Sequence, residues 1–447
     1  MQYISYDKKD LPVFGQYDGV IVGGGTSGAV AALSALKEGL TTLIIEKNGC
    51  LGGMQTTGMV TPMMPNHMPN YPRCALDMEI NAELAKFSAY TEELKQGEKA
   101  TCGSFNPIFL QAVLDQLITK NRGSIVFHTA VVDAIVVDGR IDCVIVYNTG
   151  GLQAVLAKCF IDCTADAELC RMCGGGLFSG NQDGINQNVS LRFEMAGVDI
   201  PAYEKHMAQI CSAEGGRLAF MTDKYEKGYI RKDDIYHFQT FEIPGKPNCL
   251  AFNCTELGRS KNTTAPLHIS QKMFEGRQAV IKLADFCVRF LDGFQNAYIS
   301  AISPVLGLRE TNRIDAEYML TISDVFGYRK FEDGIAVSNY PLDAHGEKNF
   351  GLVYNDYIEA SPEQRYYEIP LRSLIPKGVD NLLCAGRCIG TDFLTQATTR
   401  VQTTCRYMGE AAGIACRFAI EEQIPFRQLQ GQKVRRLMAR RGAEMLK

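Results

Sequence analysis

The most constraining feature of this chain is a glycine-rich loop near its start. An apolar run leads into Gly23-x-Gly25-x-x-Gly28, followed by an alanine-rich stretch and by residues 41–46, which end on Glu46. This order predicts a strand, a tight turn, a helix and a second strand. Gly23 permits the turn, Gly25 lets the backbone approach a pyrophosphate at the helix N-terminus, and Gly28 lets the helix pack on the strand. Glu46 lies 18 residues beyond Gly28, where an acid can accept hydrogen bonds from a ribose diol, so the sequence predicts a dinucleotide site.

Two further regions indicate which dinucleotide is bound. The pair Gly52-Gly53 follows closely after Glu46, a spacing more typical of FAD than of NAD enzymes. Residues 133–147 predict two strands joined by an Asp-Gly turn, and residues 152–156 a third strand that completes a meander. Residues 159–166 then predict a strand ending in Thr-Ala-Asp. These features resemble the glutathione-reductase-like FAD superfamily, in which this last segment returns the chain beside the flavin.

The C-terminal half carries a third set of motifs. The resemblance rests on these segments in order: 306–314 (LGLRETNRI), 340–345 (YPLDAH), 367–376 (YEIPLRSLIP), 381–392 (NLLCAGRCIGTD), 399–402 (TRVQ) and 408–413 (MGEAAG). The series resembles the bacterial FAD-dependent oxidoreductase family, in its heterodisulfide-reductase-subunit-A-like branch. The resemblance covers residues 17–445 and is weakest across residues 180–295. Ala165, Asn312 and Leu371 depart from the Gly, Arg and aromatic residue that the family more often has.

The motif order implies an α/β fold with a discontinuous FAD-binding Rossmann-like domain. We expect its parallel sheet and three-stranded meander to come from residues 14–178 and 376–425, with a helical tail over 426–447. Residues 179–375 should form an inserted α+β substrate or cap domain with a mixed sheet. The apolar spacing predicts amphipathic helices over residues 74–90 and 106–121. Gly409 and Gly413 suit a helix packed closely beneath the flavin.

The resemblance also implies which residues hold the cofactor. In the superfamily a C-terminal helix directs its N-terminus at the flavin, and residues 391–402 are the candidate segment, where Arg400 would stabilise the anionic reduced flavin. The expected cofactor-binding residues are Gly23, Gly25, Thr26, Ser27, Gly28, Glu46, Lys47, Gly52, Gly53, Met54, Val132, Thr164, Ala165, Asp166, Gly386, Arg387, Asp392, Arg400 and Val401.

A second group of residues is expected on the substrate side. The candidate catalytic residues are His345, Arg309, Arg313, Arg372 and Arg400, with Glu310 and Asp343 beside them in the same motifs. His345 suits proton transfer at neutral pH, although a hydrogen-bonded structural histidine fits equally well. Arg309 and Arg313 are four residues apart, so on a helix they would share a face and could hold a carboxylate or phosphate. Alternatively, Arg309 pairs with Glu310. His67 lies in a proline-rich loop, where a histidine without a role at the flavin is the favoured interpretation.

The cysteines argue against disulfide chemistry at the flavin. Glutathione-reductase-type disulfide enzymes place a redox pair just after the Gly-Gly of this region, but residues 52–58 contain no cysteine. Cys159, Cys163, Cys170 and Cys173 cluster, and the last two have metal-like spacing. Cys159 and Cys163 fall on a predicted buried strand, where free cysteine behaves as a small hydrophobe. We therefore expect core cysteines and no metal, with a zinc or iron–sulfur site as the alternative.

Composition sets the class of protein and its surroundings. A chain of 447 residues with 46% hydrophobic content supports two or three domains with sizeable cores. The net charge of −4 argues against a nucleic-acid partner, and no apolar run approaches the ~20 residues of a membrane span. Sixteen cysteines and the lack of a hydrophobic signal core favour the cytoplasm.

These features predict an FAD-dependent dehydrogenase or oxidase. No second GxGxxG follows a strand, so we expect electrons to come from a small polar organic metabolite by hydride transfer to flavin N5, and to leave to an unidentified acceptor. Two alternatives stay open. The chain could be a flavin electron carrier in a larger redox complex, or it could bind flavin or NAD without turnover.

Overall fold

A seven-stranded sheet forms the larger part of the molecule. The computed structural model describes residues 10–64, 73–87, 103–346 and 364–444. The strand order is β5 (Ser124–Val126), β2 (Thr42–Ile45), β1 (Val13–Val22), β8 (Gly151–Asp162), β7 (Arg140–Asn148) and β6 (Ala130–Val137), with β19 (Leu382–Cys384) pairing with the end of β8. Strands β5, β2, β1, β8 and β19 are parallel, whereas β6, β7 and β8 form an antiparallel meander. The predicted α/β class, with a parallel sheet and a three-stranded meander, is confirmed.

The long strand β8 joins the two halves of this sheet. Its first residues pair with β7, and residues 160–162 pair with β19 on the same edge. Along its other edge it pairs with β1. The expectation of a short meander strand over 152–156, separate from the strand that follows at 159, was therefore wrong. The continuous strand carries the chain from the meander directly to the C-terminal edge of the parallel strands.

Two helices pack closely on one face of the parallel strands, α1 (Thr26–Lys37) and α11 (Gln402–Glu422). A Cβ atom on Gly409 would lie 2.4 Å from the carbonyl oxygen of Ser27, and one on Gly413 would lie 2.6 Å from that of Ala31. Only glycine allows backbones to approach this closely, which confirms the predicted role of both glycines in helix packing.

The remaining helices of this part agree with the sequence. Asn106 caps the predicted helix, α3 (Pro107–Lys120), by accepting a hydrogen bond from the Ile108 N–H. The helix expected over 74–90 is α2 (Ala75–Ala85), and residues 88–90 lie outside the described part of the chain. The smaller elements are β3 (Pro62–Met63), β4 (Gly103–Ser104), α4 (Glu168–Met172), α10 (Phe393–Thr399) and the 3₁₀ turns Gly53–Gln55, Leu371–Leu374 and Phe426–Gln428.

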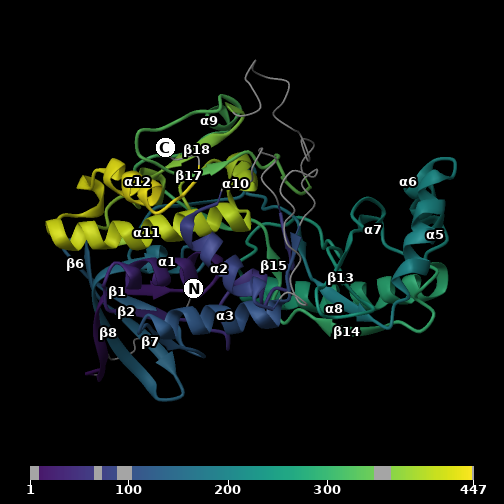
Figure 1. The fold of residues 1–447 in the computed structure, drawn as a ribbon, viewed down its shortest axis with the longest axis horizontal. Coiled ribbons are helices and arrows are strands. Elements are labelled where there is room, and N and C mark those ends of the chain that lie inside the picture. Colours follow the sequence, from purple (N-terminus) through teal and green to yellow (C-terminus); the bar gives the residue numbers. More distant parts are fainter. Residues whose placement is uncertain (1–9, 65–72, 88–102, 347–363, 445–447) are drawn as a thin grey trace.

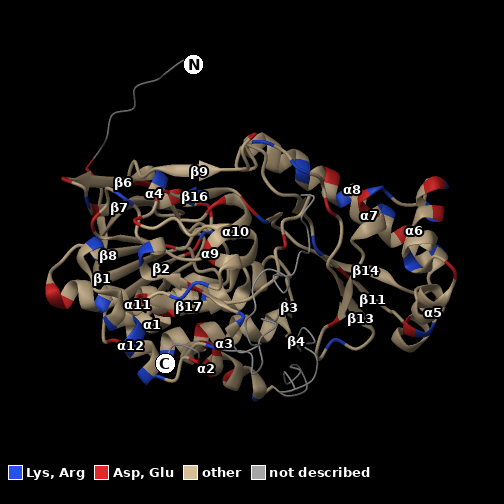
Figure 2. Cartoon of the chain, turned by 90° about the horizontal axis from the view of Figure 1, so that it is seen from above, with Lys and Arg blue, Asp and Glu red and all other residues tan. Residues whose placement is uncertain are grey.

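A second, smaller part projects from one end and is called the cap here (Figure 1). Its sheet has the order β12 (Thr240–Glu242), β13 (Cys249–Phe252), β11 (Phe193–Ala196) and β14 (Tyr298–Ile302). The cap helices are α5 (Ile200–Ser212), α6 (Gly216–Glu226), α7 (Asp233–Tyr236) and α8 (Pro266–Phe290). All three strand pairings are antiparallel, so the expected mixed sheet was wrong for these four strands. Both signs of charge occur along the cap helices (Figure 2).

The chain returns from the cap through short two-stranded ribbons. Strand β15 (Gly307–Leu308) pairs with β10 (Val189–Ser190), β16 (Asn312–Ile314) with β9 (Leu177–Ser179), and β17 (Gly334–Ser338) with β18 (Tyr367–Pro370). Helix α9 (Ile322–Phe326) lies between the last two pairs in sequence. Leu320, Ile335 and Tyr367 share one hydrophobic core with α1 and α11. We therefore propose that the cap is shorter than the expected range 179–375 and ends before residue 314.

The basic C-terminal segment forms α12 (Gly431–Arg440), within the helical tail expected over 426–447, and part of this helix is buried. Val434 and Met438 are fully buried, and Arg435 pairs with the buried carboxylate of Glu368 at 2.9 Å. The basic residues therefore serve partly to attach the helix to β18. No helix in the described residues combines the length and apolarity needed to cross a membrane.

A buried carboxyl group between α11 and α2 predicts a pH-dependent stability. Glu410 accepts a hydrogen bond from the Leu76 N–H at 2.9 Å. Burial, only partly opposed by hydrogen bonds from Leu76 and Cys74, raises the pKa of Glu410 from 4.5 to about 7. Between these values the folded protein keeps a proton that the unfolded chain releases, so the free energy of unfolding falls as pH rises, by about 3 kcal/mol.

Glu410→Gln is expected to remove this fall in stability at higher pH, because glutamine stays neutral and its carbonyl oxygen can still accept a hydrogen bond from the Leu76 N–H. The measurement is the thermal midpoint of wild type and variant at about pH 5 and about pH 8. Glu421→Gln, on an exposed turn of the same helix, is the matched control. Parallel pH dependences of wild type and Glu410→Gln would contradict the assignment.

Candidate functional site

A cavity of about 870 Å³ lies at the C-terminal edge of the parallel strands. Its lining includes Val22, Ile45, Cys163 and Ala385, the last or next residues of β1, β2, β8 and β19. Ligands of open α/β sheets bind at this edge. The opposite end of the cavity is lined by cap residues, including Arg192 and Asn253. The cavity volume falls within the ~300–1,000 Å³ of typical ligand sites.

The glycine-rich loop and Glu46 form one end of this cavity. The Glu46 carboxylate accepts the Gly24 N–H and the Asn48 N–H, both at 2.7 Å, and it is buried. These bonds fix the acid at the end of β2, beside the loop. The N-terminus of α1 at Gly25 has no side-chain cap among the described residues, so its N–H groups are free to donate hydrogen bonds to an anion in the cavity.

Glycine is required in the loop for two separate reasons. Gly23 has φ +94°, and a Cβ there would lie 2.6 Å from the carbonyl oxygen of Cys163. A Cβ on Gly53 would lie 2.8 Å from the Cα of Gly25, so the two loops touch. A Cβ on Gly25 itself would meet no protein atom closer than 3.9 Å. Gly25 therefore leaves open a space that belongs to the cavity.

The Thr-Ala-Asp segment closes the middle of the cavity. Buried Asp162 accepts the Thr164 N–H at 3.0 Å and the Cys170 N–H at 3.0 Å, which shapes the turn after β8. Ala165, the departure from the family, has φ +68°, a conformation that glycine adopts more easily. Asp166 pairs with Arg387 at 2.6 Å, so two segments distant in sequence are held together at the cavity wall.

Most of the expected cofactor-binding residues line this cavity. Those in its lining are Gly23, Gly25, Thr26, Ser27, Glu46, Lys47, Gly53, Met54, Thr164, Ala165, Asp166, Gly386, Arg387, Arg400 and Val401. The N-terminus of α11, at Val401 and Gln402, is the helix end that faces the cavity within segment 391–402. The structure thus brings together residues from five separate stretches of sequence.

Four expected cofactor residues lie outside the lining. A Cβ on Gly28 would fall 1.9 Å from the Gly23 carbonyl oxygen, so this glycine serves helix packing. Gly52 has φ +97° and donates its N–H to the Gly24 carbonyl, a role in the turn. Val132 points outward at a bulge of β6 and is 45% exposed, whereas its neighbour Val131 lines the cavity. Asp392 caps α10 by accepting the Thr395 N–H at 2.7 Å.

The cap end of the cavity contains a chain of alternating charges. Arg309 pairs with Glu256 at 3.1 Å, and Glu256 contacts Nδ1 of His345. The Nε2 atom of His345 lies 3.0 Å from Asp343, which pairs with Arg400 at 2.9 Å. All five side chains are buried or half-buried. Asp343 and His345 line the cavity, whereas Glu256 lies behind them.

Both carboxylates of this chain are held ionised. Burial alone would raise the pKa of Glu256, but the hydrogen bond to His345 and the charge of Arg309 hold that pKa well below its usual range. For Asp343 the contributions of His345 and Arg400 outweigh burial in the same way, and its pKa is also strongly lowered. The site therefore presents fixed negative and positive groups on either side of one imidazole.

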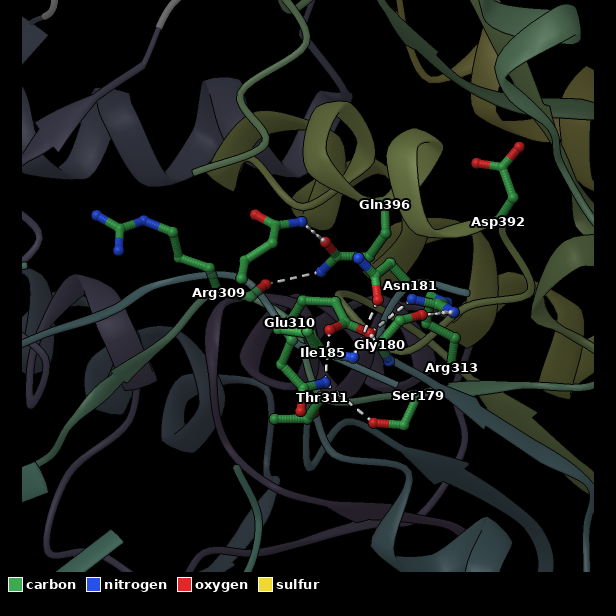
Figure 3. Close-up of polar contacts among 12 residues, drawn as sticks. Ser179, Gly180, Asn181, Ile185, Arg309, Glu310, Thr311, Arg313, Asp392 and Gln396 are labelled. Carbon is green, nitrogen blue, oxygen red and sulfur yellow. Dashed lines mark hydrogen bonds and ion pairs between the residues drawn. The ribbon is translucent and has the colours of Figure 1, made fainter. Parts of the chain in front are cut away.

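Two expected catalytic arginines lie elsewhere. Arg313 is buried in an ion pair with Glu310 at 2.5 Å and donates to the Gly180 carbonyl. Residues 307–308 and 312–314 form strands and residues 309–311 between them are not helical, so Arg309 and Arg313 do not share a helix face. In Figure 3 the Arg309 side chain points away from Glu310 and Arg313, and Asp392 lies apart from them. Arg372 pairs with Asp333 at 2.9 Å, and its side chain is 49% exposed. Neither Arg313 nor Arg372 lines the cavity.

The suggested pairing of Arg309 with Glu310 was also wrong, since each has a different partner. Several site residues were not found from the sequence: Arg192, Asn253, Glu256, Tyr340 and Gln402. A local signal existed for Arg192. Arg192 is a charged residue between the apolar residues Leu191 and Phe193, which both enter the cap core. No feature of the sequence around Glu256 indicates that it belongs to the site. His67 lies outside the described residues.

The clustered cysteines lie in hydrophobic surroundings. Cys159, Cys163 and Cys170 are buried in the cores beside the parallel sheet, and all cysteines of the described part of the chain are free. A different group, His237, Glu256 and His345, is the described set whose ligand atoms lie within 4.8 Å of one another. Arg309 already occupies Glu256, and its charge would repel a cation. We therefore interpret the group as the Glu256–His345 pair, against which the His237 ring packs with its centroid 5.2 Å from that of the His345 ring.

Comparison with known proteins places these observations in a family. A family model described as FAD dependent oxidoreductase matches residues 18–438. A dihydrolipoyl dehydrogenase from Trypanosoma brucei brucei is 50% identical over 46 residues, a stretch that spans only 10% of either chain. The solved structure of p-nitrophenol 4-monooxygenase from Pseudomonas putida has a TM-score of 0.50 with 10% identity, covering 97% of this chain and 88% of that one. At this identity the likeness concerns the fold alone.

The cavity fits FAD by its own features. The open space beside Gly25, the uncapped N-terminus of α1 and the buried Glu46 match a pyrophosphate and a ribose diol. The match of the family model extends over nearly the whole chain. The chain therefore belongs to the family of FAD-dependent oxidoreductases, as an enzyme with FAD as its cofactor.

Proposed function

We propose that the enzyme oxidises a small polar organic metabolite. Bound FAD supplies a two-electron acceptor that takes a hydride from carbon at flavin N5. The observation that carries the proposal is the continuity of one cavity, which extends from the loop at Gly25 to the charged cluster around His345. The end of the cavity around His345 provides charged groups in addition to those that bind the cofactor. Narrower placement of the chain in the heterodisulfide-reductase-subunit-A-like branch stays a prediction.

The charged cluster supplies the proton acceptor that such an oxidation requires. Removal of a hydride from an alcohol or amine carbon releases a proton from oxygen or nitrogen, and a base must take it. Asp343 and Nε2 of His345 are 3.0 Å apart at the cavity wall. In the neutral imidazole the Nδ1–H group donates to Glu256, and the proton taken up at Nε2 then forms an N–H···O hydrogen bond to Asp343. Contact with Glu256 at the other ring nitrogen orients the imidazole and offsets its positive charge.

The arginines position the groups around this base. Arg400 holds Asp343 through both its carboxylate and its backbone carbonyl, at 2.9 and 3.1 Å. Arg309 holds Glu256 and donates to the Asn188 carbonyl at 2.8 Å. The protein thus fixes the proton acceptor before substrate arrives, which lowers the cost of reorganisation during the reaction.

The test is reduction of the bound flavin by organic compounds without oxygen. Purified enzyme carrying FAD is mixed anaerobically with a panel of hydroxy acids, amino acids, polyols and simple alcohols, and loss of the flavin absorbance is followed. We expect rapid bleaching by at least one polar compound. Bleaching by a reduced protein partner alone would favour the electron-carrier alternative, and no bleaching by either would favour binding without turnover.

Gly25→Ala is expected to weaken FAD binding while leaving the fold intact. The added methyl group meets no protein atom closer than 3.9 Å, and the backbone at Gly25 is extended with negative φ. The methyl group would instead occupy the space that the pyrophosphate needs. Overpacking of this kind costs ~1–3 kcal/mol, so we expect about 10- to 100-fold weaker binding of FAD.

The measurement is titration of the deflavinated protein with FAD, with the circular dichroism spectrum as a check of folding. Gly19→Ala is the matched control, because Gly19 lies in β1 and a Cβ there meets nothing within 4 Å. Equal FAD affinity of Gly25→Ala and wild type would show that the pyrophosphate lies elsewhere.

A further inference from the structure

One buried cation at the cap end of the cavity has no partner among the residues that the structure describes. Arg192 is 7% exposed, and among the described residues its guanidinium takes part in no hydrogen bond or ion pair. Its Nη1 atom is fully buried, and no atom of the described part of the chain forms a hydrogen bond with it. A buried charge of this kind is costly unless a ligand compensates it. The cavity-lining position of Arg192 means that such a ligand can reach it.

The strand arrangement fixes the side chain in this place. Arg192 lies in the two-residue link between β10 and β11; its neighbours Leu191 and Phe193 are fully buried in the cap core, whereas Arg192 itself lines the cavity. The Arg192 carbonyl accepts the Ser303 N–H at 2.9 Å, which ties the backbone to the segment after β14. Arg192 is therefore presented to the cavity by a rigid part of the cap.

The surrounding charges leave a net positive site. Burial, together with repulsion from Arg309 and Arg400, lowers the pKa of Arg192 to about 9. The other two arginines are matched by Glu256 and Asp343, so the three arginines exceed the two carboxylates by one charge. A second unpartnered donor, Nε of Arg400, is also buried here. One excess charge suits a monoanion better than a dianion.

We propose that the substrate carries a carboxylate and that Arg192 binds it. This inference rests on the proposed oxidation of a small metabolite and names the class of that metabolite, a polar organic monocarboxylate. Arg192 would donate to the carboxylate in a charge-assisted pair, while the Asp343–His345 pair meets the group that loses its proton. Neutral polyols and phosphate monoesters, which are dianions near neutral pH, are the competing classes.

The experiment measures binding, without turnover, on the holoenzyme. Isothermal titration compares acetate, glycolate and lactate with their amides acetamide, glycolamide and lactamide, and with methyl phosphate as a phosphate monoester that lacks a carboxylate. We expect the carboxylates to bind more tightly than the matched amides. Arg192→Gln should weaken carboxylate binding about 10- to 100-fold, as expected for loss of a hydrogen bond to a charged group, and should leave amide binding unchanged. Arg192→Lys should retain part of the carboxylate affinity that Arg192→Gln loses.

Arg372→Gln is the control, because it removes an arginine that lies outside the cavity. Equal affinity for acids and amides, wild-type carboxylate binding by Arg192→Gln, or stronger binding of the phosphate monoester would each overturn the proposal. The outcome is separable from the proposed function. Carboxylates that bind through Arg192 without any compound reducing the flavin would remove the oxidase function alone, whereas reduction by neutral polyols without carboxylate binding would remove this inference alone.

Discussion

His345→Gln is expected to slow reduction of the flavin by about 10²- to 10⁴-fold, the usual contribution of a positioned base. Glutamine fills much of the same space and can still contact Asp343 and Glu256, but it cannot accept a proton from substrate. The measurement is the anaerobic rate of flavin bleaching by the best compound from the substrate panel, over a range of pH. The acid limb that reports this base in wild type should disappear in the variant.

A matched control separates the chemistry from general damage. His206→Gln makes the same substitution on α5 in the cap, where His206 accepts the Asp292 N–H outside the cavity. We expect wild-type rates and a wild-type pH profile from this variant. If His345→Gln keeps both its rate and its acid limb, the proton goes to another group, and His345 has only a structural role in the cluster.

The cofactor end of the site could be predicted from the sequence because its contacts are local. Gly23, Gly25 and Glu46 belong to one strand–turn–helix–strand unit, and steric limits on the turn select the residues directly. The resemblance to a known family extended this to Arg387 and Val401, which line the same cavity from a distant segment. Asp392 was expected to bind the cofactor, but it caps α10 instead, because a polar residue just before a helix can accept hydrogen bonds from the first N–H groups of that helix.

The substrate end could be predicted only in part because it is assembled from distant segments. Arg192 and Glu256 come from the stretch where the resemblance is weakest, and Glu256 reaches the site only through the antiparallel pairing of the cap. Arg313 and Arg372 were expected in the site because charged residues in a shared motif suggest a shared role. In the structure each has a carboxylate partner of its own, in Glu310 and Asp333.

The cap boundary shows the same limit of sequence reasoning. From the sequence, residues 314–375 are expected in the cap, as part of the range 179–375. Their apolar side chains, such as Ile335 and Tyr367, instead pack with α11. Which core a segment joins depends on contacts across the whole chain, and the local pattern of hydrophobic residues does not contain that information.

Arg406→Met is expected to destabilise the protein by about 3–5 kcal/mol, the usual effect of removing one partner of a buried ion pair. Arg406 on α11 is 1% exposed at its side chain and pairs with Asp77 on α2, which is fully buried. It also donates to the Gln55 side chain at 3.3 Å, in the turn that includes Gly53 of the cavity wall. Methionine would leave the Asp77 carboxylate buried without its main counter-charge.

The measurement is the free energy of unfolding of the deflavinated protein by urea. The double variant Arg406→Met/Asp77→Asn should recover much of the loss, because it removes the uncompensated charge as well as the pair. Arg289→Met, which breaks an exposed pair with Asp285 on α8, should cost less than about 1 kcal/mol. Saturating FAD should leave the difference in free energy of unfolding between Arg406→Met and wild type unchanged if both bind FAD equally, and should widen it if the variant binds FAD more weakly, since a ligand stabilises the state that holds it. A small loss in the single variant, equal to that of Arg289→Met, would mean that the contact between α11 and α2 does not depend on charge.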